Sequence, residues 1–426
     1  WPPHNPKVAV AAAVSGGGLR AANFAVGVMS ALETYRTADG RRVDLLRELD
    51  YFSSVSGGGL AAGAYIAELK RWRATHDADE PFSLTAAMTR TRLRRRLRRN
   101  LEVSLFAGLV EPRIPFTSYD HGDALEKMID NIYFGHDAKY NRAWYPLRLG
   151  DMYVPADDTT RACELPVLAA NTTIITSCER FPVTPNMLAW LKVTTYTHRF
   201  HTVTYHAPAF YYDMPMAVPV KASASFPVAI PTSNMRCYGH GKRRYLHLQD
   251  GGVVENIGYK TALNMLKRDD PTTTRRVLVV IDAYNSTAKV HRMTRHKSSP
   301  SFAGVLAALQ TAGLESRHRV LQPELTTQGA LHRAGVVYLG FDRLLPVDRN
   351  DLTLAPQVEN LVRKGVLEPG SPAAVLGELR RQVYDISTRL KITETQQSLL
   401  YAAAEQIVHN QRPLIDRLLV AAVQAE

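Results

Sequence analysis

Three glycine-rich turns carry the residues of this sequence that are best suited to chemistry. The first is Ser15 followed by three glycines, the second places Ser56 before three more glycines, and the third begins with Asp250. A serine, a carboxylate and a cluster of backbone N–H groups are the nucleophile, the base and the anion stabiliser of acyl transfer. The three turns together therefore predict a hydrolase site.

The first turn is built to hold an anion. Gly16, Gly17 and Gly18 have no β-carbon, so their N–H groups can converge on a ligand, and the helix that follows adds the positive end of its dipole. The anion is either a bound phosphate or an oxyanion that develops during a reaction. The turn lacks the Lys-Ser/Thr pair of a phosphate loop and the glycine spacing of a dinucleotide site.

The second turn, Ser54-Val55-Ser56-Gly57-Gly58, has the form of a nucleophile elbow. In that motif a sharp strand-to-helix turn exposes the serine hydroxyl, and small neighbours such as Gly58 are needed because the helix packs closely. Ser54 stands where the usual pattern has glycine. In the third turn, Gly251 and Gly252 free the backbone after Asp250 so that the carboxylate can approach another loop. Alone, Asp-Gly-Gly is more typical of an ordinary turn or helix cap.

Strand and helix patterns alternate around these turns, which predicts an α/β fold with a mostly parallel sheet between helical layers. The predicted strands cover residues 7–14, 50–55, 165–169, 193–205, 245–248, 277–283 and 336–341, and the predicted helices include 19–35, 57–73 and 255–267. Because the carboxyl ends of parallel strands meet at one edge, the three turns should lie together there.

The 426 residues, with 45% hydrophobic and 22% charged residues, are typical of a globular protein and exclude a disordered or fibrous one. We expect a catalytic core over 7–285 and a mainly helical extension over 286–426 packed on the same domain. The polar stretch 285–300 is either a linker or a surface loop. The net charge of +12 indicates an anionic partner, which is either a lipid surface or nucleic acid.

The motifs SGGGLRA, SVSGG and DGG, in this order, resemble those of the patatin-like phospholipase family. Residues 222–227 (ASASFP) and 166–171 (PVLAAN) resemble two further segments of that family. The resemblance covers about residues 7–285 well and the remainder more loosely. It implies a three-layer patatin-type sandwich with a helix-rich C-terminal extension.

The resemblance also implies a Ser–Asp dyad that hydrolyses acyl esters of lipids. Ser56 would be the nucleophile and Asp250 the base, with Gly16, Gly17 and Gly18 as the oxyanion hole and Arg20 organising the glycine loop. The expected substrate is a phospholipid or lysophospholipid, and neither a cofactor nor a metal is expected. His247 invites a triad, but a separation of three residues on a strand places it on the opposite face from Asp250.

The other histidines and the cysteines do not predict a metal site. His198 and His206 lie on one face of a strand-like stretch and His201 on the other, which favours a location either at the surface or in a hairpin over a metal site. The three cysteines form either one disulfide with one thiol left over or three buried thiols, and they are Cys163, Cys178 and Cys237.

Residues 90–99 (RTRLRRRLRR) form the densest charged run, and leucines follow every fourth residue from Leu93 to Leu105. This spacing predicts one helix whose leucines pack on the core. Its guanidinium groups are either solvated or bind anionic lipid headgroups, with residues 106–110 entering the interface. The lipid-facing arginines would be Arg94, Arg95, Arg98 and Arg99. Nucleic acid is not expected, because no aromatic stacking platform accompanies the run.

Two other activities remain open for the same residues. A transacylase would pass the acyl group to another lipid, and a non-catalytic module would use the glycine loop to bind an anionic membrane. The chain begins at Trp1 and not at a methionine, so we expect that a preceding segment has been either cut away or left out of the sequence. For the cellular location of the protein, we expect association with a membrane, with the protein either secreted or in the cell envelope.

Overall fold

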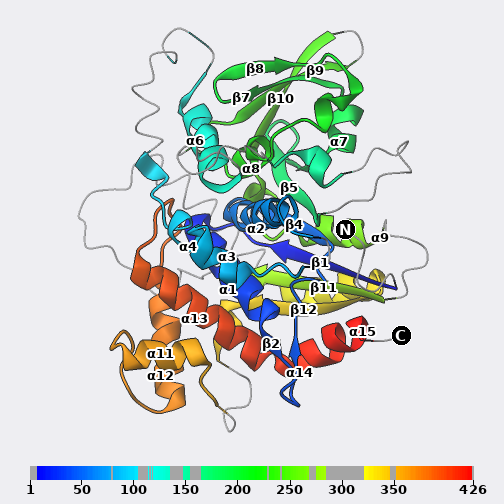
Figure 1. Cartoon of the computed structure of the whole chain (residues 1–426). Helices are drawn as coiled ribbons and strands as arrows, with labels where there is room; N and C mark the ends of the chain where they lie inside the picture. The colour runs from blue at the N-terminus through cyan, green and yellow to red at the C-terminus, as the bar shows by residue number, and fades with distance from the viewer. Residues whose placement is uncertain are drawn as a thin grey trace.

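Figure 1 shows the computed structural model of the protein. It describes residues 7–77, 80–103, 114, 117, 119–134, 147–153, 165–227, 230–239, 242–267, 275–284, 321–345 and 352–424. The stretch 285–300, residues 106–110 and Cys163 lie outside the described residues.

A ten-stranded mixed sheet forms the centre of the molecule (Figure 1). Its parallel half holds, in spatial order, β12 (Ala334–Gly340), β11 (Arg275–Asp282), β1 (Val8–Val14), β4 (Tyr51–Val55) and β5 (Val167–Ile174). An antiparallel half continues through β10 (Lys242–Asp250), β9 (Ser233–Gly239), β7 (Val193–His198) and β8 (His201–Thr204), while β6 (Glu179–Val183) pairs with β5.

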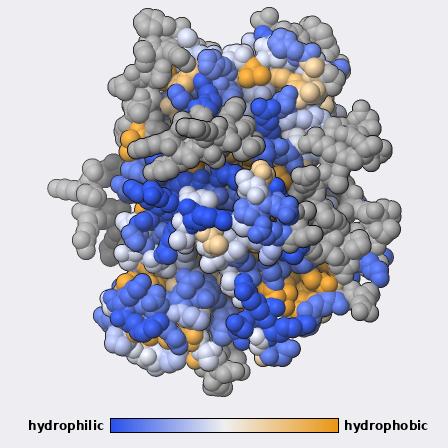
Figure 2. Space-filling view, viewed as in Figure 1, coloured by the Kyte–Doolittle hydropathy of each residue, from blue (hydrophilic) through white to orange (hydrophobic). Residues whose placement is uncertain are grey.

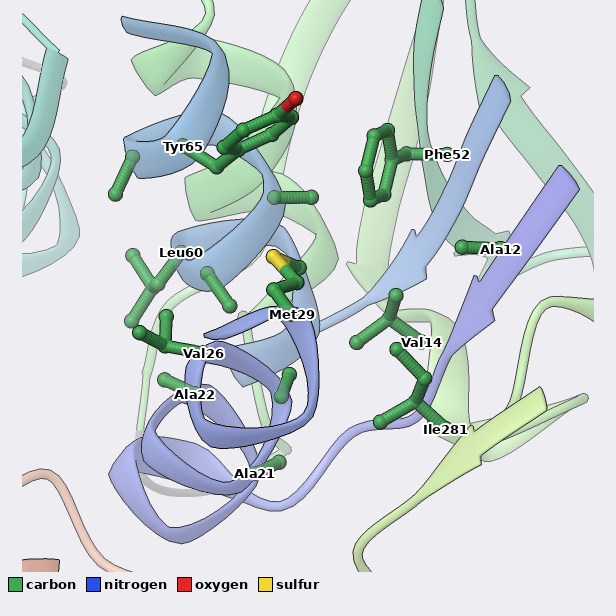
Figure 3. Packing of buried hydrophobic residues seen from close by; sticks show 14 of the residues in the cluster. Ala12, Val14, Ala21, Ala22, Val26, Met29, Phe52, Leu60, Tyr65 and Ile281 are labelled. Atoms are coloured by element: carbon green, nitrogen blue, oxygen red, sulfur yellow. The ribbon is translucent and has the colours of Figure 1, made fainter. Parts of the chain in front are cut away.

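Strand β1 is buried along its whole length, as expected of a strand covered on both faces. Its valines and Ala12 belong to the larger of two hydrophobic cores, while Ala9, Ala11 and Ala13 belong to the smaller core on the other face. This alternation follows from the two-residue period of a strand. Figure 3 shows the larger core, where the strand residues Val14, Phe52 and Ile281 face the helix residues Val26, Met29 and Leu60.

Helices cover both faces of the sheet, which confirms the predicted α/β fold of three layers. On the larger core lie α1 (Gly18–Glu33), α2 (Gly57–Arg73), α6 (His121–Ile129) and α8 (Ala217–Ser223). The other face carries α9 (Tyr259–Lys267) and a helix over 321–331. The helix-rich C-terminal region contains α11 (Pro356–Arg363), α12 (Pro372–Tyr384), α13 (Glu394–Asn410) and α14 (Arg412–Ile415).

The C-terminal region shares the same core. Strand β12 pairs with β11 in the central sheet, and α13 packs along α1. Residues of α13 such as Leu400 and Ile407 are buried in the larger core.

Several predicted elements have different bounds in the structure. The predicted strand 193–205 is a hairpin, because Arg199 and Phe200 both take positive φ angles between β7 and β8. The helix predicted from residue 255 begins at Tyr259, and the Glu255 carboxylate instead accepts the N–H groups of residues 257–260. This carboxylate replaces the missing intrahelical acceptors of the first turn.

The single helix predicted through the arginine run was also wrong. The structure has α3 (Leu84–Arg90) and the one-turn α4 (Leu93–Arg96), separated by Arg92 in the left-handed conformation with φ 56°. The predicted packing of the leucines was correct for the described residues, because Leu93, Leu97 and Leu101 are fully buried.

Candidate active site

Ser56 lies at the tip of a sharp turn between β4 and α2. It is the N-terminal cap residue of α2 and has φ 50° and ψ −122°, a conformation that residues with a side chain rarely adopt. Such a backbone costs about 1–3 kcal/mol and persists only where the surroundings impose it. The side chain is largely buried. This is the geometry of a nucleophile elbow.

Two glycines let other segments approach the elbow closely. A β-carbon on Gly58 would lie 2.6 Å from the carbonyl oxygen of Val14, at the end of β1. A β-carbon on Gly57 would collide with the carbonyl of Gly18. The glycines after Ser56 are therefore required by the contact between α2 and the glycine loop.

Asp250 ends β10 and is 5% exposed. Burial raises the pKa of its carboxyl from 3.8 to about 6, although hydrogen bonds from the Gly252 N–H and from the Ser56 side chain act to lower it. The Gly252 bond is 2.7 Å long. A β-carbon on Gly251 would collide with the Asn171 carbonyl, so a glycine at this position allows the turn to pack closely against β5. The structure thus brings together a serine and a carboxylate that are far apart in sequence.

The glycine loop lies next to this pair. Gly17 and Gly18 have φ angles of 141° and 60°, which favour glycine, and a β-carbon on Gly16 would lie 3.2 Å from the β-carbon of Ser56. The N–H of Gly16 donates to the carbonyl of Asn256 over 2.9 Å. Gly16 was predicted as an oxyanion donor, but its N–H already has a protein acceptor here. The N-terminal end of α1 follows directly at Gly18.

The buried side chain of Arg20 lies next to Gly17 of the glycine loop. The residue is 4% exposed, and its guanidinium group donates to the carbonyl of Ile386 over 2.9 Å. Burial lowers the pKa of Arg20 to about 10, while the nearby charge of Asp282 acts to raise it. In the same way, the Leu19 N–H donates to the carbonyl of Arg389 over 2.9 Å. The segment between α12 and α13 therefore forms part of the wall behind the glycine loop.

Three residues for which the sequence predicts no role connect the segments of the site. Asn171 is fully buried, and its amide donates to the Ser53 hydroxyl and the Ser54 carbonyl, both over 2.9 Å. Ser223 Oγ accepts the N–H of Ser56 over 2.9 Å. The side-chain oxygen of Asn256 lies so close to Gly16 and Gly252 that a β-carbon on either glycine would collide with it. The local sequence gives no signal of this role. Asn171 and Ser223 act on partners more than a hundred residues away, and so does Asn256 in its contact with Gly16.

His247 does not belong to the site. Its Nδ1 lies 2.6 Å from Oδ1 of Asn234, which pairs it along the β9–β10 ladder. His198 contacts the Glu126 carboxylate over 2.9 Å and lies in the β7–β8 hairpin, as predicted. Among the described residues no group of three or more metal-binding side chains converges.

Two cysteines are described, and both are free thiols. Cys237 is buried but Cys178 is exposed, so the interpretation of three buried thiols was wrong at Cys178. No helix in the described ranges has both the length and the apolar composition that crossing a membrane requires.

The arginine run is partly engaged in internal contacts. Arg94 donates to Gln397 and Ser398 on α13, and Arg98 pairs with Glu394 on the same helix over 2.6 Å. Arg95 and Arg99 are exposed. Figure 2 shows hydrophilic side chains over the surface where α3 and α4 lie. Of the four arginines predicted to face lipid, two therefore fasten this segment to the C-terminal region.

Known protein families and solved structures include matches to this chain. The sequence profile of the patatin-like phospholipase family matches residues 12–263, which include all three turns. Human GIVD cytosolic phospholipase A2 is a structurally similar protein, with 10% identity and a TM-score of 0.46. The alignment covers 98% of this chain and 63% of that one, so the present chain spans less than two thirds of its length. No curated protein matches the sequence. Since the family profile spans more than half of the chain, this protein belongs to the patatin-like phospholipase family.

Proposed function

We propose that the protein is a lipid acyl hydrolase that uses a Ser56–Asp250 dyad. The observation that carries the proposal is the strained elbow at Ser56 beside a buried Asp250 carboxylate that accepts a hydrogen bond from the serine side chain. Family membership supports carboxylic ester hydrolysis of lipids, and the substrate proposed is a phospholipid or lysophospholipid.

The dyad divides hydrolysis into two steps. Ser56 Oγ attacks the acyl carbonyl carbon while its proton passes to Asp250, and the leaving alcohol then takes that proton as the ester bond breaks. Water next attacks the acyl-serine, again giving its proton to Asp250, and the fatty acid leaves as Ser56 recovers the proton. With a pKa of about 6, the carboxyl is mostly ionised at neutral pH and is a stronger base than an exposed aspartate.

The glycine loop would stabilise the oxyanion of both tetrahedral intermediates. Gly17 and Gly18 supply the proposed N–H donors, because the Gly16 N–H is already donated to Asn256. One such donor is typically worth about 3 kcal/mol of transition-state stabilisation. The N-terminal end of α1 adds a favourable dipole at the same place.

Covalent labelling with a fluorophosphonate tests the proposal directly. We expect the wild type to be labelled, Ser56→Ala to be unlabelled, and Asp250→Asn to be labelled far more slowly. The rate at which each protein hydrolyses phospholipid vesicles, measured as release of fatty acid, should rank the three proteins in the same order. Equal labelling of all three proteins would place the nucleophile elsewhere.

The same assays distinguish the other activities. Vesicle binding without labelling or ester turnover would indicate a non-catalytic membrane module. Labelling accompanied by acyl transfer to an added lipid alcohol, in preference to release of free fatty acid, would indicate a transacylase.

A further inference from the structure

We propose that Ser223, at the C-terminal end of α8, is a positioning residue that holds Ser56 in its reactive conformation. The inference rests on the proposed function of Ser56 and deepens it. Ser223 lies 167 residues from Ser56 in the sequence, on a different element, and is fully buried. It does not need to touch the substrate for this role.

The hydroxyl of Ser223 makes two hydrogen bonds with fixed directions. It donates to the main-chain carbonyl of Asn171 on β5 over 2.5 Å, and it accepts the N–H of Ser56 over 2.9 Å. Because its only proton is committed to Asn171, a lone pair of Oγ is left facing the Ser56 N–H. The hydrogen bond to β5 therefore fixes the orientation of the Ser223 hydroxyl, and the hydroxyl in turn fixes the position of the Ser56 N–H.

The Ser56 N–H needs such an acceptor. With φ 50° and ψ −122°, Ser56 lies between strand β4 and helix α2, so its N–H has no acceptor within regular secondary structure. A buried N–H without an acceptor is destabilising, and the strained backbone would relax towards an ordinary conformation. Relaxation of the turn would swing Oγ away from Asp250.

The same strand also fixes the segment below the turn. The side chain of Asn171 holds Ser53 Oγ and the carbonyl of Ser54, while its main-chain carbonyl holds Ser223. The Asn171 side-chain oxygen in turn accepts from Thr261 on α9. Strand β4, the elbow and the end of α8 are thus tied to one residue of β5, and Ser223 is the link that reaches the nucleophile.

A matched control lies two residues further along. Ser225 is also fully buried, and its hydroxyl donates to the carbonyl of Lys221 over 3.0 Å. Ser223→Ala and Ser225→Ala each remove one buried hydroxyl near the same helix end. Only the first of them removes the acceptor of the Ser56 N–H.

The test compares fluorophosphonate labelling rates, kcat and KM for a soluble ester, and thermal midpoints of these variants. We expect Ser223→Ala to lower the labelling rate and kcat about 10- to 100-fold with KM nearly unchanged, because a misplaced nucleophile affects the chemical step. Ser225→Ala should stay within about twofold of the wild type. Ser223→Cys keeps the size of the side chain but is a weak acceptor, so it should behave like Ser223→Ala.

Three outcomes would overturn the inference. Equal losses in Ser223→Ala and Ser225→Ala would show a general effect of packing. Wild-type rates in folded Ser223→Ala or Ser223→Cys would reject the positioning role alone and leave the dyad intact. Absence of labelling in the wild type would instead reject the proposed nucleophile, and the positioning role with it.

Discussion

Replacing Asp250 by asparagine should make the folded protein more stable at neutral pH while it removes the catalytic base. Burial raises the pKa of this carboxyl from 3.8 to about 6, so the folded protein binds the proton more tightly than the unfolded chain. Ionising Asp250 therefore costs more free energy in the folded protein than in the unfolded chain, which lowers the stability of the fold. This destabilisation is absent below about pH 4, grows between pH 4 and 6, and is complete above pH 6.

The magnitude follows from the size of the shift. About two pKa units correspond to about 3 kcal/mol of stability at pH 8. For 426 residues the entropy of unfolding is about 0.9 kcal/mol per kelvin, so Asp250→Asn should raise the thermal midpoint by about 3 °C. Asparagine keeps a side-chain oxygen that can accept the Gly252 N–H.

Calorimetric melting of both proteins at pH 4, 6 and 8 checks this expectation. Asp213→Asn is the control, because Asp213 is exposed and pairs with Arg148 at the surface. Its replacement should not produce an increase in the thermal midpoint that grows with pH. A lower midpoint for Asp250→Asn at pH 8, or a difference from wild type that is the same at all three pH values, would refute the reasoning.

Three further predictions concern catalysis, the glycine loop and the surface. The pKa of Asp250 predicts that kcat/KM for a soluble ester rises with pH and levels off above about pH 6, and a plateau reached already at pH 4 would contradict it. Gly18→Ala should slow labelling at least tenfold, because its φ is 60° and the new β-carbon would lie 2.5 Å from the Arg389 carbonyl oxygen. Gly40→Ala, at φ 84° but with open space around it, is the control, and equal slowing in both variants would argue against a specific role for the loop. The double variant Arg95→Glu, Arg99→Glu should weaken sedimentation with anionic vesicles about tenfold or more at low salt, and unchanged binding would exclude this surface.

Much of the architecture could be predicted from local patterns. A buried apolar run ended by glycines and followed by helical spacing is a property of neighbouring residues, so β1, β4 and the helices after them were predicted correctly in type. The break at Arg199 and Phe200 inside the strand predicted over 193–205 was missed, because nothing in the local composition marks two positive φ angles. The arginine run was assigned to one helix because its leucines repeat every fourth residue, and a single left-handed residue at Arg92 interrupts it.

The sequence by itself determined which residues could react, because the residue types around each turn are a local property. It therefore predicted Ser56, Asp250 and the glycine loop, each between a strand and a helix. Only the tertiary structure decided what holds them together. Asn171 and Ser223 act on β4 and the elbow across more than a hundred residues, and Arg389 reaches the glycine loop from the C-terminal region. Hydrogen bonds between distant segments depend on how the sheet and its helices pack, and no spacing along the chain encodes them.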